Sequence, residues 1–343
     1  MRLLKLANAA LRMRRRELTF VSFNVTNRCT QRCPMCGVWS APSDELPVAE
    51  IIEIFTGLRR AGAAVIEVSG GEPFLRPDIF EILEAFDRLG YLYTVTTNGT
   101  LLTPEILDRL GTCTGLLQLA VSLDSLDCSR YERLRGVDSL PRVLESLDMI
   151  AASGRNLPVK LNVTMSRVNR DEILDILACA KERRLGMSVF PVVQGAGLAH
   201  RADDDVFSAS ESERREMADL FRHLVRLRRS GEPLWEYSGY YEVAAEYVMG
   251  HSIGTCDAGR VFLDVRANGD LAACVDLPAV ASLRAGGVAR ALALVEGERK
   301  HIRRCSENTP CCYTCTANIT QTARHPLRYA FETARVRLRA SRA

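Results

Sequence analysis

The sequence has no long hydrophobic run and is poor in histidine and aromatic residues. Its 343 residues include five His and two Trp, and aromatic side chains make up 6%. No apolar stretch approaches the roughly 20 residues that a membrane-spanning helix needs. Residues 1–17, MRLLKLANAALRMRRRE, form a basic amphipathic stretch without the cleavage site of a signal peptide. We therefore expect a cytoplasmic protein without a membrane-spanning segment.

The chain also lacks a strong net charge. The formal value of +3 is too small to indicate a nucleic-acid partner. Arginines nevertheless crowd both ends, where leucine and alanine recur at helical intervals. These arginines are Arg12, Arg14, Arg15 and Arg16 near the start, and Arg324, Arg328, Arg335, Arg337, Arg339 and Arg342 near the end. We expect solvated helix ends that cap the fold. Contact with an anionic membrane surface or an acidic partner is the less favoured alternative.

Short runs rich in β-branched residues alternate with helical patterns from about residue 20 to 195. The expected strands are Phe20–Thr26, Val65–Ser69, Tyr91–Thr97, Leu116–Leu123, Val159–Met165 and Met187–Val193. Helical connections of this length indicate a parallel sheet with an outer helical layer. Six units are fewer than the eight of a closed TIM barrel. We therefore predict an α/β fold, a partial (β/α)6 TIM-like barrel with a small C-terminal appendage.

Polar and apolar side chains alternate along these strands. The polar positions are Glu67, Ser69, Thr94, Thr96, Asn98, Gln118, Ser122, Asp124, Lys160, Asn162 and Thr164. Parallel strands that are covered on both faces are normally apolar throughout. The alternation therefore predicts that helices cover one face while the polar face lines a barrel interior with a binding site. A solvent-facing antiparallel sheet is the alternative.

The pattern changes after the sixth expected strand, and the chain divides into five segments. These are a basic amphipathic helix over 1–19, the barrel over 20–195, a linker and helix over 196–250, a small metal-bound appendage over 251–320 and a basic helix over 321–343. In the third of these segments, a long amphipathic helix is expected over Glu211–Arg229.

Twelve cysteines are present, and in the cytoplasm they are more often metal ligands or buried thiols than disulfides. The first strand is followed by TNRCTQRCPMCGVW, which contains Cys29, Cys33 and Cys36. A tetrahedral zinc site would need a fourth ligand, and no histidine lies nearby. A 4Fe–4S cluster held by three cysteines leaves one iron open to an exogenous ligand. The spacing therefore favours a catalytic iron–sulfur site over zinc.

The second expected strand ends in Gly70-Gly71-Glu72-Pro73, where parallel-sheet enzymes place ligand groups. Two glycines allow the backbone to approach a ligand closely, and a glutamate can accept hydrogen bonds from an ammonium group. As an isolated tetrapeptide this motif most often forms a turn. One strand–helix unit after a three-cysteine loop, it indicates a cofactor site.

Together with Thr96–Gly99 (TTNG), these motifs resemble the radical S-adenosylmethionine (SAM) superfamily, over roughly Phe20 to Gln194. The resemblance implies that Cys29, Cys33 and Cys36 hold a catalytic 4Fe–4S cluster whose open iron binds SAM. It implies SAM contacts at Gly70, Gly71, Glu72, Asn98, Ser122, Asp124, Arg135, Asn162 and Thr164. It further implies an electron donor such as flavodoxin or ferredoxin, and a 5′-deoxyadenosyl radical that abstracts hydrogen from carbon. Met35 departs from the aromatic residue that many relatives carry before the third cysteine.

A second group of cysteines follows in the C-terminal part. Cys256 and Cys274 flank an expected hairpin at Asn268-Gly269. The arrangement resembles the twitch appendage, a shortened SPASM domain. That resemblance implies an auxiliary 4Fe–4S cluster on four residues, with Cys311 able to replace Cys312. The four are Cys256, Cys274, Cys312 and Cys315. A structural zinc site is the alternative, and Cys305 is left without a role.

Three residues are candidates for work on the substrate. Glu67 and Lys160 share the polar face, where they are expected to contact the substrate or adjust its protonation; a buried pair that ties strands together is the alternative. Cys128 could donate a hydrogen atom to a product radical.

We expect an oxidoreductase that acts on a small-molecule or lipid-like substrate, with net two-electron oxidation favoured. Redox-neutral chemistry is the first alternative: epimerisation, carbon–carbon bond formation or adenosyl addition, which could act on a peptide. A non-catalytic iron–sulfur or zinc scaffold is the second alternative, which the polar barrel face disfavours.

Overall fold

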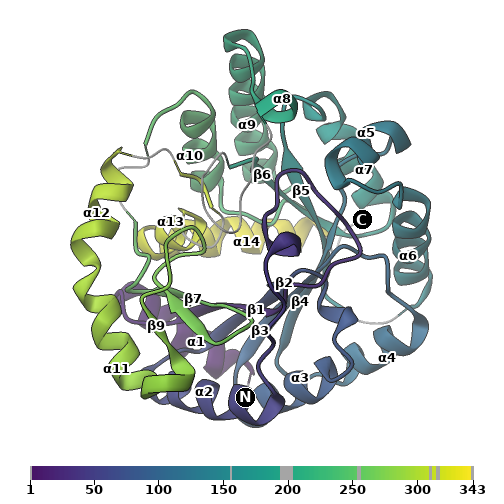
Figure 1. Cartoon of the computed structure of the whole chain (residues 1–343). Coiled ribbons are helices and arrows are strands. Elements are labelled where there is room, and N and C mark those ends of the chain that lie inside the picture. Colours follow the sequence, from purple (N-terminus) through teal and green to yellow (C-terminus); the bar gives the residue numbers. More distant parts are fainter. Residues whose placement is uncertain are drawn as a thin grey trace.

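The structure is a computed structural model of the chain and describes residues 2–154, 157–193, 204–252, 256–308, 311–313 and 317–340. Its strands form one sheet in the order β6-β5-β4-β3-β2-β1-β7-β8-β9 (Figure 1). The strands are β1 (Phe20–Thr26), β2 (Val65–Gly70), β3 (Leu92–Thr97), β4 (Leu116–Ser122), β5 (Val159–Met165), β6 (Gly186–Pro191), β7 (Phe262–Val265), β8 (Asp270–Ala272) and β9 (Ala281–Ser282). Each neighbouring pair from β1 to β6 is parallel. The predicted α/β fold with an open parallel barrel is confirmed, and the antiparallel alternative is wrong.

Helices surround the strands, as Figure 1 shows. Their bounds are α1 (Arg2–Arg14), α2 (Val48–Ala61), α3 (Ile79–Arg88), α4 (Pro104–Thr112), α5 (Cys128–Arg135), α6 (Leu140–Ala152), α7 (Ile173–Glu182), α8 (Asp204–Phe207), α9 (Glu211–Ser230), α10 (Ser238–Val248), α11 (Leu283–Gly297), α12 (Arg299–Asn308), α13 (Ile319–Arg324) and α14 (Pro326–Ala340). The helix expected over Glu211–Arg229 is α9, which starts with a capping box at Ser210 and Glu213. Residues 194–203, which contain most of the expected linker, lie outside the described ranges.

The strand bounds follow the sequence pattern closely. β1 and β5 have the expected bounds, whereas β6 begins at Gly186 and ends at Pro191, slightly earlier than expected. The apolar positions of β1 face the helices: Phe23 is fully buried, with its ring centroid 4.9 Å from that of Phe55 in α2. Phe55 in turn lies 4.8 Å from Phe86 of α3. Alternate strand residues thus pack into the helical layer and leave the polar set on the inner face.

The C-terminal strands continue the barrel sheet. β7 pairs in parallel with β1, and β8 and β9 follow as antiparallel neighbours. The hairpin expected at Asn268-Gly269 is present, with Gly269 at φ +87°, a conformation that glycine adopts without strain. The appendage is therefore built on the first barrel strand, a connection that the sequence pattern does not reveal.

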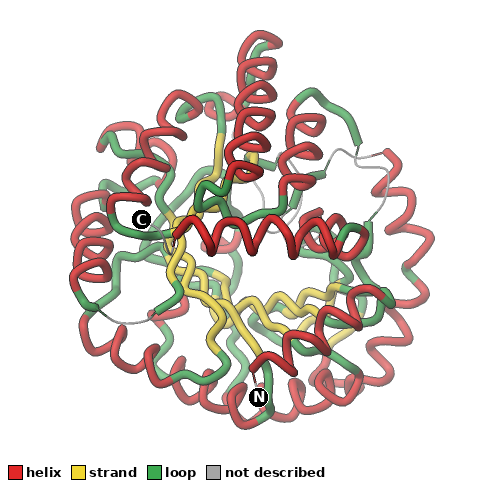
Figure 2. Tube along the Cα trace, turned by 180° about the vertical axis from the view of Figure 1, so that it is seen from behind, coloured by secondary structure: helices red, strands yellow, loops and turns green. Residues whose placement is uncertain are grey.

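Terminal helices cover the amino ends of the strands. Arg2 of α1 donates to the carbonyl of Leu116 at the start of β4, at 2.8 Å. The other end of α1 is fixed by an ion pair between Arg16 and buried Asp257. Figure 2 shows α1, which begins beside the label N, and α14, which ends beside the label C, on the same side of the molecule. Across the described ranges, no helix combines the length and the apolar character needed to cross a membrane.

Candidate active site

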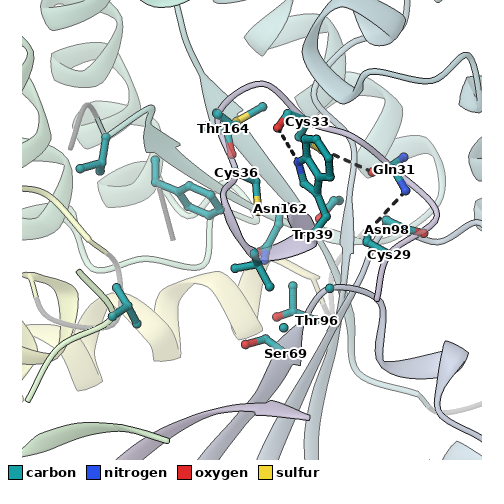
Figure 3. A pocket seen from close by; sticks show the side chains of 18 of the residues that line it. Cys29, Gln31, Cys33, Cys36, Trp39, Ser69, Thr96, Asn98, Asn162 and Thr164 are labelled. Atoms are coloured by element: carbon teal, nitrogen blue, oxygen red, sulfur yellow. Dashed lines mark hydrogen bonds between the residues drawn. The ribbon is translucent and has the colours of Figure 1, made fainter. Parts of the chain in front are cut away.

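A cavity of about 320 Å³ lies inside the barrel, toward the carboxyl ends of the strands. Figure 3 shows side chains from the cysteine loop and from the polar strand positions converging on it. Its lining includes Ser22, Asn24, Cys29, Gln31, Cys33, Cys36, Trp39, Glu67, Ser69, Gly70, Gly71, Thr96, Asn98, Ser122, Arg135, Asn162, Thr164, Phe190, Val275, Cys312 and Tyr313. The prediction that the polar face surrounds a site is therefore confirmed for strands β2 to β5.

The loop after β1 brings Cys29, Cys33 and Cys36 to the cavity wall. The amide of Asn98 donates to the Cys29 sulfur at 3.6 Å, and the Trp39 indole N–H donates to the Cys33 carbonyl at 3.2 Å. Burial raises the pKa of Cys33 to about 11, and burial also raises the pKa values of Cys29 and Cys36. Since metals bind thiolates, loading of this loop must release protons.

The donor set fits a 4Fe–4S cluster with one open iron. One short loop presents three thiols to a single cavity, and the lining named above contains no histidine. The fourth thiol of the lining, Cys312, comes from the C-terminal part of the chain and not from this loop. In addition, the Oδ1 atom of Asn162 is a buried acceptor without a hydrogen-bond partner at the described residues. Among those residues, no three cysteine, histidine or acidic side chains already stand around one point in the geometry of a metal site.

The glycine motif abuts the cysteine loop. A Cβ atom on Gly71 would stand 2.0 Å from the carbonyl oxygen of Arg28, and Gly70 has φ +121°. The amide of Gly71 donates to the carbonyl of Thr26 at 2.7 Å. Only glycine permits this approach, so the motif holds the base of the cysteine loop against the end of β2.

We expected Glu72 to accept hydrogen bonds from an ammonium group, whereas its partners in the structure belong to the chain itself. The side chain is fully buried and is not part of the cavity lining. Its carboxylate accepts from the hydroxyl of Thr97 at 2.9 Å and from the backbone N–H groups of Asn98 at 2.8 Å and Phe74 at 3.2 Å. Burial raises its pKa to about 7. Glu72 thus ties the end of β2 to the end of β3, and its direct contact with the cofactor stays a prediction.

Asp124 and Arg135 form a buried ion pair beside the loop. The Arg135 Nη2 and Asp124 Oδ2 atoms are 2.7 Å apart, and the other oxygen of Asp124 accepts from the backbone of Thr164 at 2.7 Å. Arg135 lines the cavity and lowers the pKa of the Cys33 thiol, opposing the larger effect of burial, whereas Asp124 does not reach the cavity. Asp124 pairs with Arg135 in the structure, and its predicted contact with SAM stays a prediction.

The remaining predicted SAM contacts are brought together. Asn98, Ser122, Asn162 and Thr164 all line the cavity, from β4, from β5 and from the residue that follows β3. Figure 3 shows Asn162 and Thr164 on the side of the cavity near Cys36, and Asn98 near Cys29. Asn98 also donates to the hydroxyl of Thr30 at 2.8 Å, which fixes its amide.

Glu67 and Lys160 have different surroundings. Glu67 lines the cavity, and burial raises its pKa while the charge of Lys160 opposes that shift. Lys160 is absent from the lining: its ammonium donates to Ser188 at 2.7 Å and lies 3.7 Å from the carboxylate of Glu236. Glu67 therefore remains a candidate for substrate contact, whereas Lys160 belongs to a buried network at the amino end of β6.

Cys128 is exposed and lies outside the cavity lining. The chain turns into α5 at this point because the side chain of Asp127 accepts from the Arg130 N–H at 2.8 Å and caps the helix. The role of Cys128 as a hydrogen-atom donor stays a prediction, and its position outside the lining does not support it.

Thiols of the C-terminal part gather in a second place. The charges of Cys311 and Cys305 contribute to raising the pKa of Cys256, although burial is the main cause, and the pKa of Cys274 is raised in turn by burial, Cys311 and Cys256. Cys312 instead lines the main cavity, and its carbonyl accepts from the Tyr240 hydroxyl at 3.0 Å. Cys315 lies outside the described residues.

Several lining residues were not foreseen. Ser22 and Asn24 continue the polar alternation on β1, so the same pattern could have identified them. Trp39 and Tyr313 carry no such signal, since one follows the cysteine loop and the other arrives from the C-terminal part of the chain.

The part of the chain that holds this site is similar in sequence to known proteins. The sequence matches the Radical SAM superfamily over residues 23–180. It is also 31% identical over 276 residues to the GTP 3′,8-cyclase of Ectopseudomonas mendocina, covering 76% of this chain and 80% of that protein. The chain belongs to the radical SAM superfamily. Membership implies a 4Fe–4S cluster and SAM at the site just described, and this radical SAM protein carries the three cysteines for it.

Two further likenesses extend over different lengths. An AdoMet-dependent heme synthase of Methanosarcina barkeri is 30% identical over 198 residues, or 57% of this chain, and the match spans only 55% of that relative. The solved structure of native anSMEcpe with bound AdoMet and Cp18Cys peptide superposes with a TM-score of 0.63 over 95% of this chain and 100% of that one. At 12% identity this second likeness concerns the fold alone.

Proposed function

We propose that this radical SAM enzyme abstracts a hydrogen atom from a small-molecule substrate held in the barrel cavity. The observation that carries the proposal is the composition of that cavity: cluster loop, predicted SAM contacts and a buried carboxylate at Glu67 line one space of about 320 Å³. When bound, the cluster and SAM would supply a 5′-deoxyadenosyl radical. A scaffold protein would have no use for a cavity into which so many polar side chains converge.

The chain's own groups have separable tasks in this proposal. Cys29, Cys33 and Cys36 hold the cluster, and the cationic Arg135 stands where it can attract a carboxylate of SAM while Asp124 fixes its direction. The unpartnered Oδ1 atom of Asn162 is available to a hydroxyl or amino donor of the cofactor. Water is restricted by the walls, because the wall opposite the cysteine loop includes Val275, Cys312 and Tyr313 from the C-terminal part.

The position of Glu67 supports the proposal that the substrate presents hydrogen-bond donors to this wall of the cavity. Its carboxyl group lines the cavity, and burial raises its pKa, so a donor or cation on the substrate would replace solvation that the group lacks. Lys160 does not offer a second charge to the substrate, because its ammonium group is engaged by Ser188 and Glu236. We therefore place substrate contact at Glu67 and not at Lys160.

We also propose an auxiliary 4Fe–4S cluster on Cys256, Cys274 and Cys311. Either Cys305 or Cys315 would be its fourth ligand. This choice rests on the mutual electrostatic influence of the first three thiols, which Cys312 does not share with Cys256 or Cys274. Val275 lines the main cavity directly beside Cys274 in sequence, so such a cluster would lie next to the substrate. A structural zinc ion is the competing occupant.

Two outcomes of the reaction have separate support. A cluster beside the cavity could accept an electron, which favours net two-electron oxidation of the substrate. The 31% identical relative is named a GTP 3′,8-cyclase, which favours redox-neutral rearrangement instead. We retain oxidation as the proposed direction and cyclisation or epimerisation as the second candidate.

The deciding experiment is mass spectrometry of the true substrate and product, with 5′-deoxyadenosine quantified in the same reaction. Loss of two hydrogens with one 5′-deoxyadenosine per product supports oxidation. An unchanged mass supports rearrangement, and a product that carries the adenosyl group would contradict both. Failure of the anaerobically reconstituted enzyme to form any 5′-deoxyadenosine from SAM would overturn the proposed function itself.

A further inference from the structure

Large apolar side chains that are exposed gather in one part of the molecule. The described residues of this kind, with their exposed fractions, are Leu4 (75%), Leu6 (38%), Leu11 (46%), Leu174 (43%), Trp235 (44%), Leu294 (47%), Leu327 (86%) and Phe331 (63%). All but Leu174 and Leu294 lie in α1, in α14 or in the loop before α10. Scattered exposed leucines need no explanation, but a cluster on a few neighbouring elements does.

The helix α1 lies across the amino ends of the barrel strands. Its first residue, Arg2, binds the carbonyl at the start of β4, and Ala9 packs against Val65 and Leu92 at the starts of β2 and β3. Contacts with β4, β3 and β2 along one helix fix it as a cap on this end of the barrel. The cavity with the cysteine loop lies at the opposite end.

The same end of the barrel carries α14 and Trp235. The Trp235 N–H donates to the carbonyl of Met187, the second residue of β6, at 2.8 Å. Three residues further on, the hydroxyl of Ser238 donates to Glu332 of α14 at 2.6 Å. Between α14 and α1 lies α13, which contacts both. Figure 2 shows α1 and α14 together on the near side. We call α1, α13, α14 and Trp235 the rear face.

Charge on the rear face is of one sign. The sequence of α1, RLLKLANAALRMR, has no acidic residue. In α13 and α14 the acidic residue is Glu332, which is 4% exposed and engaged by Ser238. Exposed arginines accompany the apolar side chains: Arg14 and Arg15 follow Leu11, and Arg335 lies with its guanidinium 5.2 Å from the ring centroid of Phe331.

We propose that the rear face binds the surface of an anionic lipid bilayer. Leucine and phenylalanine side chains that protrude from helices among basic residues match the chemistry of helices that lie in a membrane interface. The acids that border this face, Glu17 and Glu242, are each paired with an arginine, Arg12 and Arg328. Anionic headgroups attract arginine, and the apolar side chains enter the acyl boundary. The bound protein would hold the opposite, cavity-bearing end toward the aqueous phase, so its substrate would arrive from water. This inference does not depend on the proposed reaction.

The test is flotation of the full-length protein with vesicles of phosphatidylcholine plus phosphatidylglycerol, compared with phosphatidylcholine alone. We expect the protein to float with the anionic vesicles only and to be released by high salt, because screening weakens the attraction. The double variants Leu327→Ser/Phe331→Ser and Arg14→Glu/Arg15→Glu should each lower the partition coefficient by about tenfold or more. These positions are exposed, so the fold should be kept, which circular dichroism checks.

A matched control comes from the two exposed leucines elsewhere. Leu174→Ser/Leu294→Ser removes two partly exposed leucines from α7 and α11, on other parts of the surface, and should leave flotation unchanged. Quenching of tryptophan fluorescence by brominated lipid gives a second measurement, which should fall strongly in Trp235→Phe. Equal flotation of all variants, or a protein that stays in the aqueous fraction with both vesicles, overturns the proposal. So does a dimer in sedimentation that Leu327→Ser/Phe331→Ser dissociates, because a second copy would then occupy the face.

Discussion

The two groups of cysteines differ in how the chain brings them together. Cys29, Cys33 and Cys36 come from one loop whose base is fixed by Gly70 and Gly71, and all three line one cavity. The second group is drawn from three described segments of the chain, around 256, 274 and 305–312. A site within one loop depends on local spacing alone, whereas the second depends on how separate segments pack.

A functional difference should accompany this structural one. The first loop faces predicted SAM contacts on successive strands, so its loss should remove the reaction. Cys274 of the second group directly precedes Val275, which lines the same cavity, so loss of this group should leave SAM cleavage possible and change what happens to the substrate. Paired substitutions in the two regions can separate these roles.

The largest effect is expected at the first loop. Cys33→Ala should reduce 5′-deoxyadenosine formation below detection, because the loop after β1 has no further thiol to replace the missing thiolate. Cys29→Ala and Cys36→Ala should behave alike. Cys128→Ala is the matched control, since that thiol is exposed and outside the cavity. Cleavage at the wild-type rate in Cys33→Ala would remove the basis for the active site.

Iron content should distinguish the ligands of the second group. The reconstituted wild type should hold about eight irons in two four-iron clusters, and Cys311→Ala should hold about four. Cys312→Ala is the control and should keep both clusters, because Cys312 faces the main cavity and Tyr240. The reverse result would assign the ligand to Cys312. About one zinc per chain, without the absorption of an iron–sulfur cluster, would favour the structural zinc site.

Asp264 of β7 provides a stability test in the C-terminal part. Burial raises its pKa to about 7 from a usual 3.8, and its Oδ1 atom has no hydrogen-bond partner among described residues. The folded protein therefore binds this proton more tightly than the unfolded chain, so the free energy of unfolding falls as pH rises from about 4 to 7. Asp264→Asn should flatten that fall and stabilise the protein by about 2–4 kcal/mol above pH 7.

The measurement is urea unfolding under anaerobic conditions at pH 5 and pH 8. Asp270→Asn, at a more exposed position on the neighbouring strand β8, should leave the pH dependence as in the wild type. If Asp264→Asn destabilises the protein equally at both pH values, its carboxylate is held in the ionised form and the argument from burial is wrong.

The smallest effect is expected at Glu67, whose carboxylate lines the barrel cavity. Glu67→Gln should lower product formation about tenfold, through loss of a charge-assisted hydrogen bond to the substrate. Uncoupled formation of 5′-deoxyadenosine should continue, because the cysteine loop is not touched. Lys160→Met serves as the comparison and should affect stability more than turnover, since its ammonium is paired with Glu236. Normal turnover in Glu67→Gln would contradict substrate contact.

Much of the barrel could be predicted because its signals are local. Polar alternation along β2 to β5 identified Asn98, Ser122, Asn162 and Thr164, which all line the cavity. The same pattern could not show that the carboxylate of Glu72 turns inward to Thr97 and Asn98, since that depends on where β3 ends relative to β2. Nor could it distinguish adjacent cysteines, because the side chains of Cys311 and Cys312 face different partners only after the C-terminal segment has packed.

The parallel pairing of β1 with β7 has a consequence for biosynthesis. Phe20 lies opposite Phe262, and Arg16 reaches Asp257 across 241 residues of sequence. Such long-range pairing is a late and slow event in folding. While the ribosome is still translating, β1 has a bare edge and the wall with Val275, Cys312 and Tyr313 does not yet exist. The cysteine loop therefore lacks this wall until the last quarter of the chain has been synthesised and has paired with β1.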